Sequence, residues 1–184
     1  MREVKKALRK ELISRRKAMN SCEKAAADSD IFEQIKGLID NADAVFTYAS
    51  TEIEVDTRRI IQYCLEKKIP VALPVSGDEE LDFFFINSTD ELKKGRYNID
   101  EPPQTFPAVP TEKTLCIVPA LCADGNGLRL GYGKGYYDRF LSVFSGTSVI
   151  ICYDDFRCEV PAEPHDRKAD YTFFNRKTVN NGRK

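Results

Sequence analysis

Three glycines at alternate positions, 131, 133 and 135, lie among basic residues and tyrosines in the stretch LRLGYGKGYYDR from Leu128 to Arg139. Glycine lets backbone N–H groups approach a ligand closely, and N–H groups that open a helix form a donor surface for an anion. Arg129 and Lys134 add positive charge, and Asp138 adds a carboxylate that can hold a metal ion accompanying a phosphate. The stretch therefore predicts a phosphate-binding site.

Two common phosphate-binding motifs do not match this stretch. A Walker A loop requires Gly-Lys followed by Ser or Thr, but Gly135 follows Lys134 here. A dinucleotide fingerprint requires the spacing G-x-G-x-x-G, whereas these glycines are spaced G-x-G-x-G, so Asp154, about 20 residues onward, is a weak candidate for a ribose-binding acid. A glycine-rich turn that serves only tight packing remains as an alternative.

Composition limits the class of protein. The 184 residues are 42% hydrophobic and carry a formal net charge of −1. This size suits one domain over residues 1–184, with a polar tail from about residue 175, and gives no general affinity for nucleic acid. The N-terminus is charged, and no apolar run approaches the roughly 18 residues of a membrane span. We expect a cytoplasmic monomer that binds small molecules, with neither nucleic acid nor membrane as a partner.

Six cysteines, at positions 22, 64, 116, 122, 152 and 158, form no C-x-x-C pair, and several fall inside strand-like or helix-like runs. A disulfide framework is not expected in a chain of this size, and reduced thiols in a cytosolic setting fit better. With a single histidine in the chain, a structural zinc site is not expected either.

The element that opens the chain is predicted to be a basic helix over residues 2–18. Apolar residues recur every four positions from Val4 to Leu12, and proline and glycine are absent. Lys5 and Arg9 are one turn apart, so their side chains project from the same side and can grip a phosphate together. The alternative is that this basic face is simply solvated.

Helix-like and strand-like runs then alternate. We expect a helix from Asn20, which caps it together with Glu23, and further helices from Asp56-Thr57 to 67, at 89–94 and at 135–144. Strands are expected at 44–48, 71–73, 81–86, 115–118, 148–152 and 171–174. Irregular chain is expected at 98–110 and 120–127. Strand, helix and strand in succession imply parallel pairing, and the strand at 81–86 can be antiparallel. The predicted fold is a three-layer α/β/α domain with a mainly parallel, Rossmann-like sheet. Glu54 follows the first strand, where ligand-binding loops lie, unless it is merely solvated.

Four segments resemble the 5-formyltetrahydrofolate cyclo-ligase family, also called methenyltetrahydrofolate synthetases. The longest comprises Pro119-Ala120-Leu121, Asp124, Gly127 and the run from residue 129 to residue 139. The shorter ones are Lys5-x-x-x-Arg9, Glu54-Val55-Asp56-Thr57, and Pro161 through His165-Asp166 to Asp170. The resemblance spans nearly the whole chain.

This resemblance implies a reaction that uses ATP as co-substrate and Mg²⁺ as cofactor. The formyl oxygen of 5-formyltetrahydrofolate would be activated as a phosphate ester, after which N10 attacks and phosphate leaves, giving 5,10-methenyltetrahydrofolate, ADP and phosphate. Such chemistry needs positioned phosphates and charge neutralisation more than a side-chain nucleophile. The sequence agrees, because no Ser-His-Asp or Cys-His arrangement is evident.

The resemblance also implies roles for individual residues. The ATP-binding residues would be Lys5, Lys6, Ala7, Leu8, Arg9, Arg129, Leu130, Gly131, Tyr132, Gly133, Lys134, Gly135, Tyr136 and Tyr137. The substrate-binding residues would be Glu54, Tyr132, Gly133, Lys134, Gly135 and Tyr136. Lys134 and Arg129 would act in catalysis, and Asp138 and Asp170 would bind the metal ion. His165 and Asp166 would brace the loop that carries Asp170.

Three residues depart from the family pattern. Ala123 stands where phenylalanine is usual and is expected to change the wall of the folate pocket. Phe174 stands where threonine is common and is expected to alter packing only. Lys134 stands where glycine is frequent. Two other functions remain as alternatives: an enzyme that acts on sugar phosphates or CoA groups on a similar sheet, and a nucleic-acid-binding module that uses the basic first helix.

Overall fold

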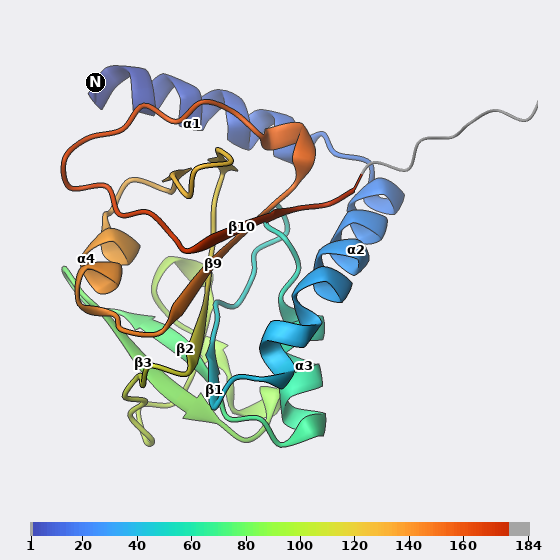
Figure 1. Cartoon of the computed structure of the whole chain (residues 1–184), viewed down its shortest axis with the longest axis vertical. Coiled ribbons are helices and arrows are strands. Elements are labelled where there is room, and N and C mark those ends of the chain that lie inside the picture. Colours follow the sequence, from blue (N-terminus) through green and yellow to red (C-terminus); the bar gives the residue numbers. More distant parts are fainter. Residues whose placement is uncertain (1, 177–184) are drawn as a thin grey trace, which may run out of the picture.

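A six-stranded sheet lies at the centre of the computed structural model, which describes residues 2–176 (Figure 1). The strand order is β10 (Tyr171–Phe174), β9 (Thr147–Cys152), β6 (Thr114–Val118), β1 (Ala44–Phe46), β2 (Val71–Ser76) and β3 (Leu81–Ile86). Neighbouring strands pair in parallel, except that β3 runs antiparallel to β2. The predicted mainly parallel sheet is confirmed, and so is the antiparallel direction of its edge strand.

Helices cover both faces of the sheet. Figure 1 shows α2 (Ser21–Asp40) and α3 (Arg58–Lys67) on one side and α4 (Tyr136–Val143) on the other. Phe140 of α4 packs on Phe83 with ring centroids 4.8 Å apart. The predicted three layers are therefore present. Within residues 2–176, no helix is both long enough and apolar enough to cross a membrane.

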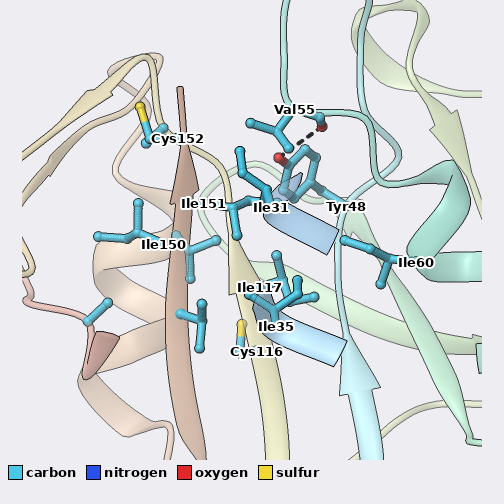
Figure 2. Packing of buried hydrophobic residues seen from close by; sticks show 14 of the residues in the cluster. Ile31, Ile35, Tyr48, Val55, Ile60, Cys116, Ile117, Ile150, Ile151 and Cys152 are labelled. Atoms are coloured by element: carbon cyan, nitrogen blue, oxygen red, sulfur yellow. Dashed lines mark hydrogen bonds between the residues drawn. The ribbon is translucent and has the colours of Figure 1, made fainter. Parts of the chain in front are cut away.

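The core gathers apolar side chains from the strands and from the helices that face them. Figure 2 shows Ile31 and Ile35 of α2 close to Ile117 of β6 and Ile151 of β9, and all four are fully buried. β-branched side chains suit a packed sheet, and full burial of each contributes about 1.5–3 kcal/mol. The sheet is thus a rigid base for the loops at its edges.

The helix starts partly follow their predicted caps. Asn20 caps α2 with its side chain, as expected. At the start of α3, however, the hydroxyl of Thr57 donates to the carbonyl of Tyr48 and caps no helical N–H group. The N–H group of Arg58 is instead bonded by the Asp56 carboxylate at 2.9 Å. These bonds tie the start of α3 to the loop that follows β1.

Several short elements differ from the prediction. A 3₁₀ helix at Thr89–Glu91 and strand β4 (Lys93–Lys94) replace the helix expected over residues 89–94. β4 pairs with β5 (Asp100–Glu101), and β7 (Cys122–Ala123) pairs with β8 (Arg129–Leu130). Of these four strands, β5 and β7 lie in segments that were expected to be irregular. Strands of two residues leave no readable alternation in the sequence. Two further 3₁₀ helices cover Arg96–Asn98 and Asp154–Phe156.

The expectation that all six thiols are free is wrong for one pair. Cys122 and Cys158 form a disulfide, with Cα atoms 6.2 Å apart. The reason is a contact between distant segments, since the N–H group of Cys158 donates to the carbonyl of Ala123 at 3.0 Å. The cysteines at positions 22, 64, 116 and 152 are free thiols.

The first helix, α1 (Arg2–Lys17), has the predicted bounds to within a residue. Of the predicted apolar stripe, Leu12 is buried and Leu8 packs against the core, but Val4 is 58% exposed. Two basic residues, Lys5 and Arg16, are buried with Leu12. They face the rest of the chain, where they find carboxylate and carbonyl partners.

Candidate active site

A cavity of about 960 Å³ lies at the carboxyl ends of the central strands. Its floor includes Tyr48 and Ala49, which follow β1, Ser76 at the end of β2, and Pro119, which follows β6. The chain continues from β1 to β2 on one side, while β6 flanks β1 on the other, so the strand order reverses here. Ligands usually bind at such a point, and the volume is within the range of about 300–1,000 Å³ of small-molecule sites.

Charged side chains of both signs line this cavity. The basic residues are Arg2, Lys5, Arg9, Arg129, Lys134, Arg139 and Arg167. The acidic residues are Glu54, Asp100, Glu101, Asp138, Glu163 and Asp166. Basic residues thus come from α1, from the glycine-rich stretch and from the segment before β10. The cavity suits a polyanion that carries a metal ion.

The glycine-rich stretch forms one wall of the cavity and leads into α4. Gly133 and Gly135 have φ angles of +94° and +70°, which glycine adopts without strain. Gly135 is the N-cap of α4 and offers no side chain to the first helical N–H groups. These groups remain available to an anion. The stretch therefore has the donor surface that its sequence predicts.

Arg9 of α1 lies directly against the glycine-rich stretch. Its Nε donates to the carbonyl of Gly131 at 2.8 Å. A Cβ atom placed on Gly133 would lie 3.0 Å from the Arg9 guanidinium carbon. The structure thus brings Arg9 to the predicted phosphate site. It does not bring all of the predicted ATP-binding segment there, since Lys6, Ala7 and Leu8 do not line the cavity.

Lys5 enters the same cavity but is held by two acids. Its Nζ lies 2.7 Å from carboxylate oxygens of both Glu163 and Asp166. Burial alone would lower the pKa of Lys5, but these hydrogen bonds and charges raise it above 10.5. Burial alone would raise the pKa of Asp166, but the hydrogen bond and the positive charge of Lys5 lower it below 3.8. Lys5 is therefore an anchored positive charge at the cavity wall.

Arg129 and Asp138 form an ion pair in the cavity. The Arg129 Nη2 atom donates to Asp138 Oδ1 at 3.0 Å, and the N–H group of Arg167 donates to the same oxygen at 3.1 Å. The Oδ2 atom of Asp138 has no hydrogen-bond partner within residues 2–176. One oxygen is thus engaged and the other can take a cation.

Asp170 has a different environment from Asp138. Its Oδ2 atom accepts from both the N–H group and the hydroxyl of Ser148, each at 2.7 Å. Ser148 and Asp170 stand at the starts of the parallel strands β9 and β10, whereas the cavity lies at the carboxyl ends of the strands. Asp170 does not line the cavity. No cluster of three or more His, Cys, Asp or Glu side chains suited to a metal ion occurs among residues 2–176.

Glu54 is buried at the cavity wall, with 5% of its surface exposed. Its Oε2 atom accepts from the N–H group and the hydroxyl of Thr51, both at 2.8 Å. The pKa of Tyr132 is raised, mainly by burial and next by the negative charge of Glu54. The Tyr132 hydroxyl thus lies beside the Glu54 carboxylate. Glu54 is therefore a fixed carboxylate, not a solvated loop side chain.

Aromatic rings border the opposite side of the cavity. Tyr136 donates from its hydroxyl to the carbonyl of Gly77 at 2.8 Å, which ties α4 to the turn between β2 and β3. The ammonium of Lys134 lies 6.0 Å from the ring centre of Tyr97. Tyr97 is 52% exposed and lines the cavity. Planar groups of a ligand can stack on such rings.

The other predicted residues are placed as follows. His165 and Asp166 both line the cavity, and Asp166 accepts from the N–H group of Glu163 at 2.7 Å, so the acid braces its own loop. Ala123 is fully buried in β7 and does not line the cavity. Phe174 is buried, and the Arg157 guanidinium lies 3.9 Å from its ring centre.

Sequence reasoning missed one residue behind the cavity and one that lines it. The first is Arg16, a buried cation on the inner face of α1 that does not line the cavity. Its signal was present in the spacing, because Lys5, Arg9, Leu12 and Arg16 are four, three and four residues apart and so share one helical face. Tyr97 was missed because it belongs to a segment without periodicity.

Comparisons with known proteins point to one family. A model described as the 5-formyltetrahydrofolate cyclo-ligase family matches residues 1–174. The chain is 27% identical over 172 residues to the 5-formyltetrahydrofolate cyclo-ligase of Mycolicibacterium smegmatis, which covers 88% of this chain and 89% of that protein.

Two solved structures share the fold. The NMR structure of Aquifex aeolicus 5,10-methenyltetrahydrofolate synthetase has a TM-score of 0.83 at 26% identity and covers 98% of this chain and 95% of that one. A 5,10-methenyltetrahydrofolate synthetase from Mycoplasma pneumoniae has a TM-score of 0.72 at 23% identity, with 91% and 96% covered, which supports the fold alone.

Proposed function

This chain belongs to the 5-formyltetrahydrofolate cyclo-ligase family, and from that premise we propose that its cavity binds ATP and 5-formyltetrahydrofolate side by side. The enzyme converts the folate to 5,10-methenyltetrahydrofolate while ATP becomes ADP and phosphate. We also propose that residues 1–184 act as one functional domain and as a monomer.

One observation carries the proposal. Cations from two distant segments, Lys5 and Arg9 of α1 and Arg129 of β8, line the same cavity as the uncapped start of α4. Such a set of fixed donors suits a triphosphate. The buried carboxylate of Glu54 lies at the same cavity and suits the donor edge of a pterin ring. The site therefore offers one region for each substrate.

The proposed reaction has two steps. The formyl oxygen of the folate attacks the γ-phosphorus of ATP, and the bond to the β-phosphate oxygen breaks, so that ADP leaves. The formyl carbon then carries a phosphate ester in place of a poor leaving group. N10 attacks this carbon and gives up its proton, and inorganic phosphate leaves as the five-membered ring closes. Both steps depend on alignment and on neutralised charge.

Arg129 and Lys134 supply that charge in the proposal. Arg129 is held rigidly by Asp138, so it needs little reorganisation as negative charge moves onto the transferred phosphoryl group. Lys134 follows Gly133 on the exposed part of the loop and can reach the phosphates from the other side. The backbone of Gly131 to Tyr137 wraps the nucleotide.

The carboxylates fit a magnesium ion that arrives with ATP. Mg²⁺ is usually held by one or two carboxylates together with substrate phosphates, and it would neutralise phosphate charge. Of the two acids that the sequence indicates, Asp138 lines the cavity with one oxygen free, so we assign the ion to it. Asp170 is held by Ser148 at the amino ends of β9 and β10, away from the cavity, and is not needed for this assignment.

A cyclisation assay tests the proposal directly. Purified protein given 5-formyltetrahydrofolate, ATP and Mg²⁺ should generate the methenyl chromophore and ADP in equal amounts. Omitting ATP or adding a chelator should abolish both. Folded protein that forms no chromophore would overturn the proposal.

Two further expectations concern context. Lys5, Arg9 and Arg16 of α1 are engaged by carboxylate and carbonyl groups, so nucleic acid would meet only the exposed basic residues of the helix. The net charge of −1 also weighs against that alternative. We also propose a cytoplasmic location. The four free thiols favour it, whereas the disulfide between Cys122 and Cys158 is of a kind that is rare in cytosolic proteins.

A further inference from the structure

Three successive carbonyl groups of the loop after β1 lie within hydrogen-bond distance of interior side chains. Arg16 donates to the carbonyl of Ile53 at 2.8 Å. Tyr153 lies 2.8 Å from the carbonyl of Glu54. Tyr48 donates to the carbonyl of Val55 at 3.3 Å, a bond drawn in Figure 2. The backbone on both sides of the Glu54 side chain is thus fixed from the protein interior.

Arg16 is a buried cation that pairs with carbonyl groups. Only 2% of its surface is exposed. Besides Ile53, it donates to the carbonyls of Ala120 at 2.8 Å and Leu121 at 3.0 Å. Among residues 2–176 no carboxylate forms an ion pair with it. Burying a charge is costly, so its retention points to a role in holding α1, the β1 loop and the β6 loop together.

Tyr153 forms the second part of the same unit. The Arg16 guanidinium carbon lies 5.2 Å from the centre of its ring. The Tyr153 hydroxyl also lies 2.6 Å from Asp28 Oδ1, and that oxygen accepts from the N–H group of Asp56 at 3.0 Å. Burial and the neighbouring Asp28 raise the pKa of Tyr153, so its hydroxyl keeps its single proton, which Asp28 Oδ1 and the Glu54 carbonyl share. The chain is therefore held at residues 53, 54 and 56.

We propose that Arg16 and Tyr153 are positioning residues for folate recognition, which act by fixing the backbone that presents the Glu54 carboxylate to the cavity. The inference rests on the proposed function, because it assumes that Glu54 contacts the folate. Neither Arg16 nor Tyr153 lines the cavity. Their effect must therefore pass through residues 53–55, and a displacement of about 1 Å in a positioned group is enough to cost a large part of activity.

The test removes single hydrogen bonds and compares the two substrates. Tyr153→Phe keeps the ring and loses the hydroxyl. Tyr63→Phe is a matched control, because the Tyr63 hydroxyl also lies 2.6 Å from an aspartate, Asp40, on the outside of α2 and α3. For Tyr153→Phe we expect the KM for 5-formyltetrahydrofolate to rise about fivefold or more while the KM for ATP changes less than about twofold. Tyr63→Phe should change neither.

A second variant guards against simple loss of folding. Arg16→Ala should raise the folate KM further, and added guanidinium ion at millimolar concentration should restore part of it by occupying the vacated place. A residue that serves only stability would lower the fraction of active enzyme and leave both KM values as they were. Equal folate KM values for Tyr153→Phe and the wild type, or equal rises for folate and ATP, would overturn the inference.

Direct binding separates this inference from the proposed function. Folate and ATP affinities are measured by calorimetry alongside the kinetics. If the wild type neither binds nor cyclises the folate, the proposed function fails and the inference fails with it. If the wild type does both and Tyr153→Phe binds the folate equally well, only the inference fails.

Discussion

Arg129 and Asp138 are joined by a 3.0 Å ion pair that uses one carboxylate oxygen and leaves the other facing no partner within residues 2–176. The engaged oxygen orients Arg129. In the proposed function the free oxygen would hold a divalent cation. The arginine and the cation would then share the negative charge of a bound triphosphate.

Replacing Asp138 with Asn should weaken the magnesium site. We expect the Mg²⁺ concentration for half-maximal turnover to rise and kcat to fall by about 10²-fold, because a preorganised charge is lost where phosphate charge develops. A titration of activity against Mg²⁺ at saturating ATP measures both. Asp170→Asn should leave the Mg²⁺ requirement unchanged and lower the melting temperature, since it breaks the bonds to Ser148. Equal rises in both variants would show that the two acids share the ion.

Glu54→Gln should raise the KM for the folate about tenfold or more, because a hydrogen bond to a charged group contributes about 1.5–3 kcal/mol. The ATP KM should stay close to that of the wild type. Glu52→Gln is the matched control, two residues away and exposed. Steady-state kinetics with each substrate varied in turn decides the matter. A folate KM that does not change in Glu54→Gln would remove Glu54 from the binding site.

Glycine substitutions can separate ligand contact from backbone strain. At Gly131 an added Cβ would meet no protein atom within 4 Å, and φ is not in the left-handed region. Gly131→Ala should therefore leave the melting temperature close to that of the wild type but raise the ATP KM, because the methyl group enters the nucleotide space. Gly37→Ala, which is equally free of contacts and lies in α2, is the control. An ATP KM that is unchanged in Gly131→Ala would place the nucleotide elsewhere.

Gly133→Ala should behave differently. Its φ of +94° and the 3.0 Å approach of a Cβ to the Arg9 guanidinium make the substitution strained. We expect lower stability, by about 1–3 kcal/mol in urea unfolding, together with lower activity. Unchanged stability would mean that the loop relaxes freely.

The ion pairs of Lys5 predict how stability depends on pH. The pKa values of Asp166 and Glu163 are lowered from 3.8 and 4.5. The two acids therefore add their full contribution to the free energy of unfolding above pH 4.5, and this contribution is lost as the pH falls through their lowered pKa values. The pKa of Lys5 is raised from 10.5, so its contribution is complete below that value and lost at higher pH. The stability difference between the wild type and Lys5→Met should therefore be constant from about pH 5 to 9 and shrink on either side.

Urea unfolding of both proteins across the pH range measures this difference. Lys6→Met is a suitable control, because Lys6 is the exposed neighbour of Lys5 on α1. A difference that does not vary with pH would show that Lys5 stabilises by packing and not by charge.

Much of the fold was readable from the sequence because its long elements have regular patterns. The strands of the central sheet are apolar runs flanked by polar turns, and α2 carries its cap at Asn20. The pairings of β4 with β5 and of β7 with β8 were not readable, because two residues show no period. The disulfide between Cys122 and Cys158 depends on such a contact between distant segments.

The sequence indicated candidate site residues where their type and spacing are unusual, but not where a residue's role depends on burial. The glycines and Arg129 were indicated by their spacing within one stretch, and Glu54 by its position after the first strand. Arg16 was overlooked because a basic residue on a helix is usually solvated, and only the carbonyl groups of Ile53, Ala120 and Leu121 reverse that expectation. The position of Asp170 was not readable either, because it depends on the direction in which β10 runs. Asp170 precedes β10 and so lies at the amino ends of the parallel strands, away from the cavity.

The contacts of α1 also set the order in which the protein can be completed as it is made. Arg9 binds a carbonyl 122 residues further on, Arg16 a sulfur atom 136 residues on, and Lys5 a carboxylate 161 residues on. On the ribosome the first helix to emerge therefore waits for partners that are made near the end of synthesis. The wall of the cavity is complete only after Asp166 has left the exit tunnel, and such long-range contacts slow folding. Until then the nascent chain holds Lys5 without its two acids.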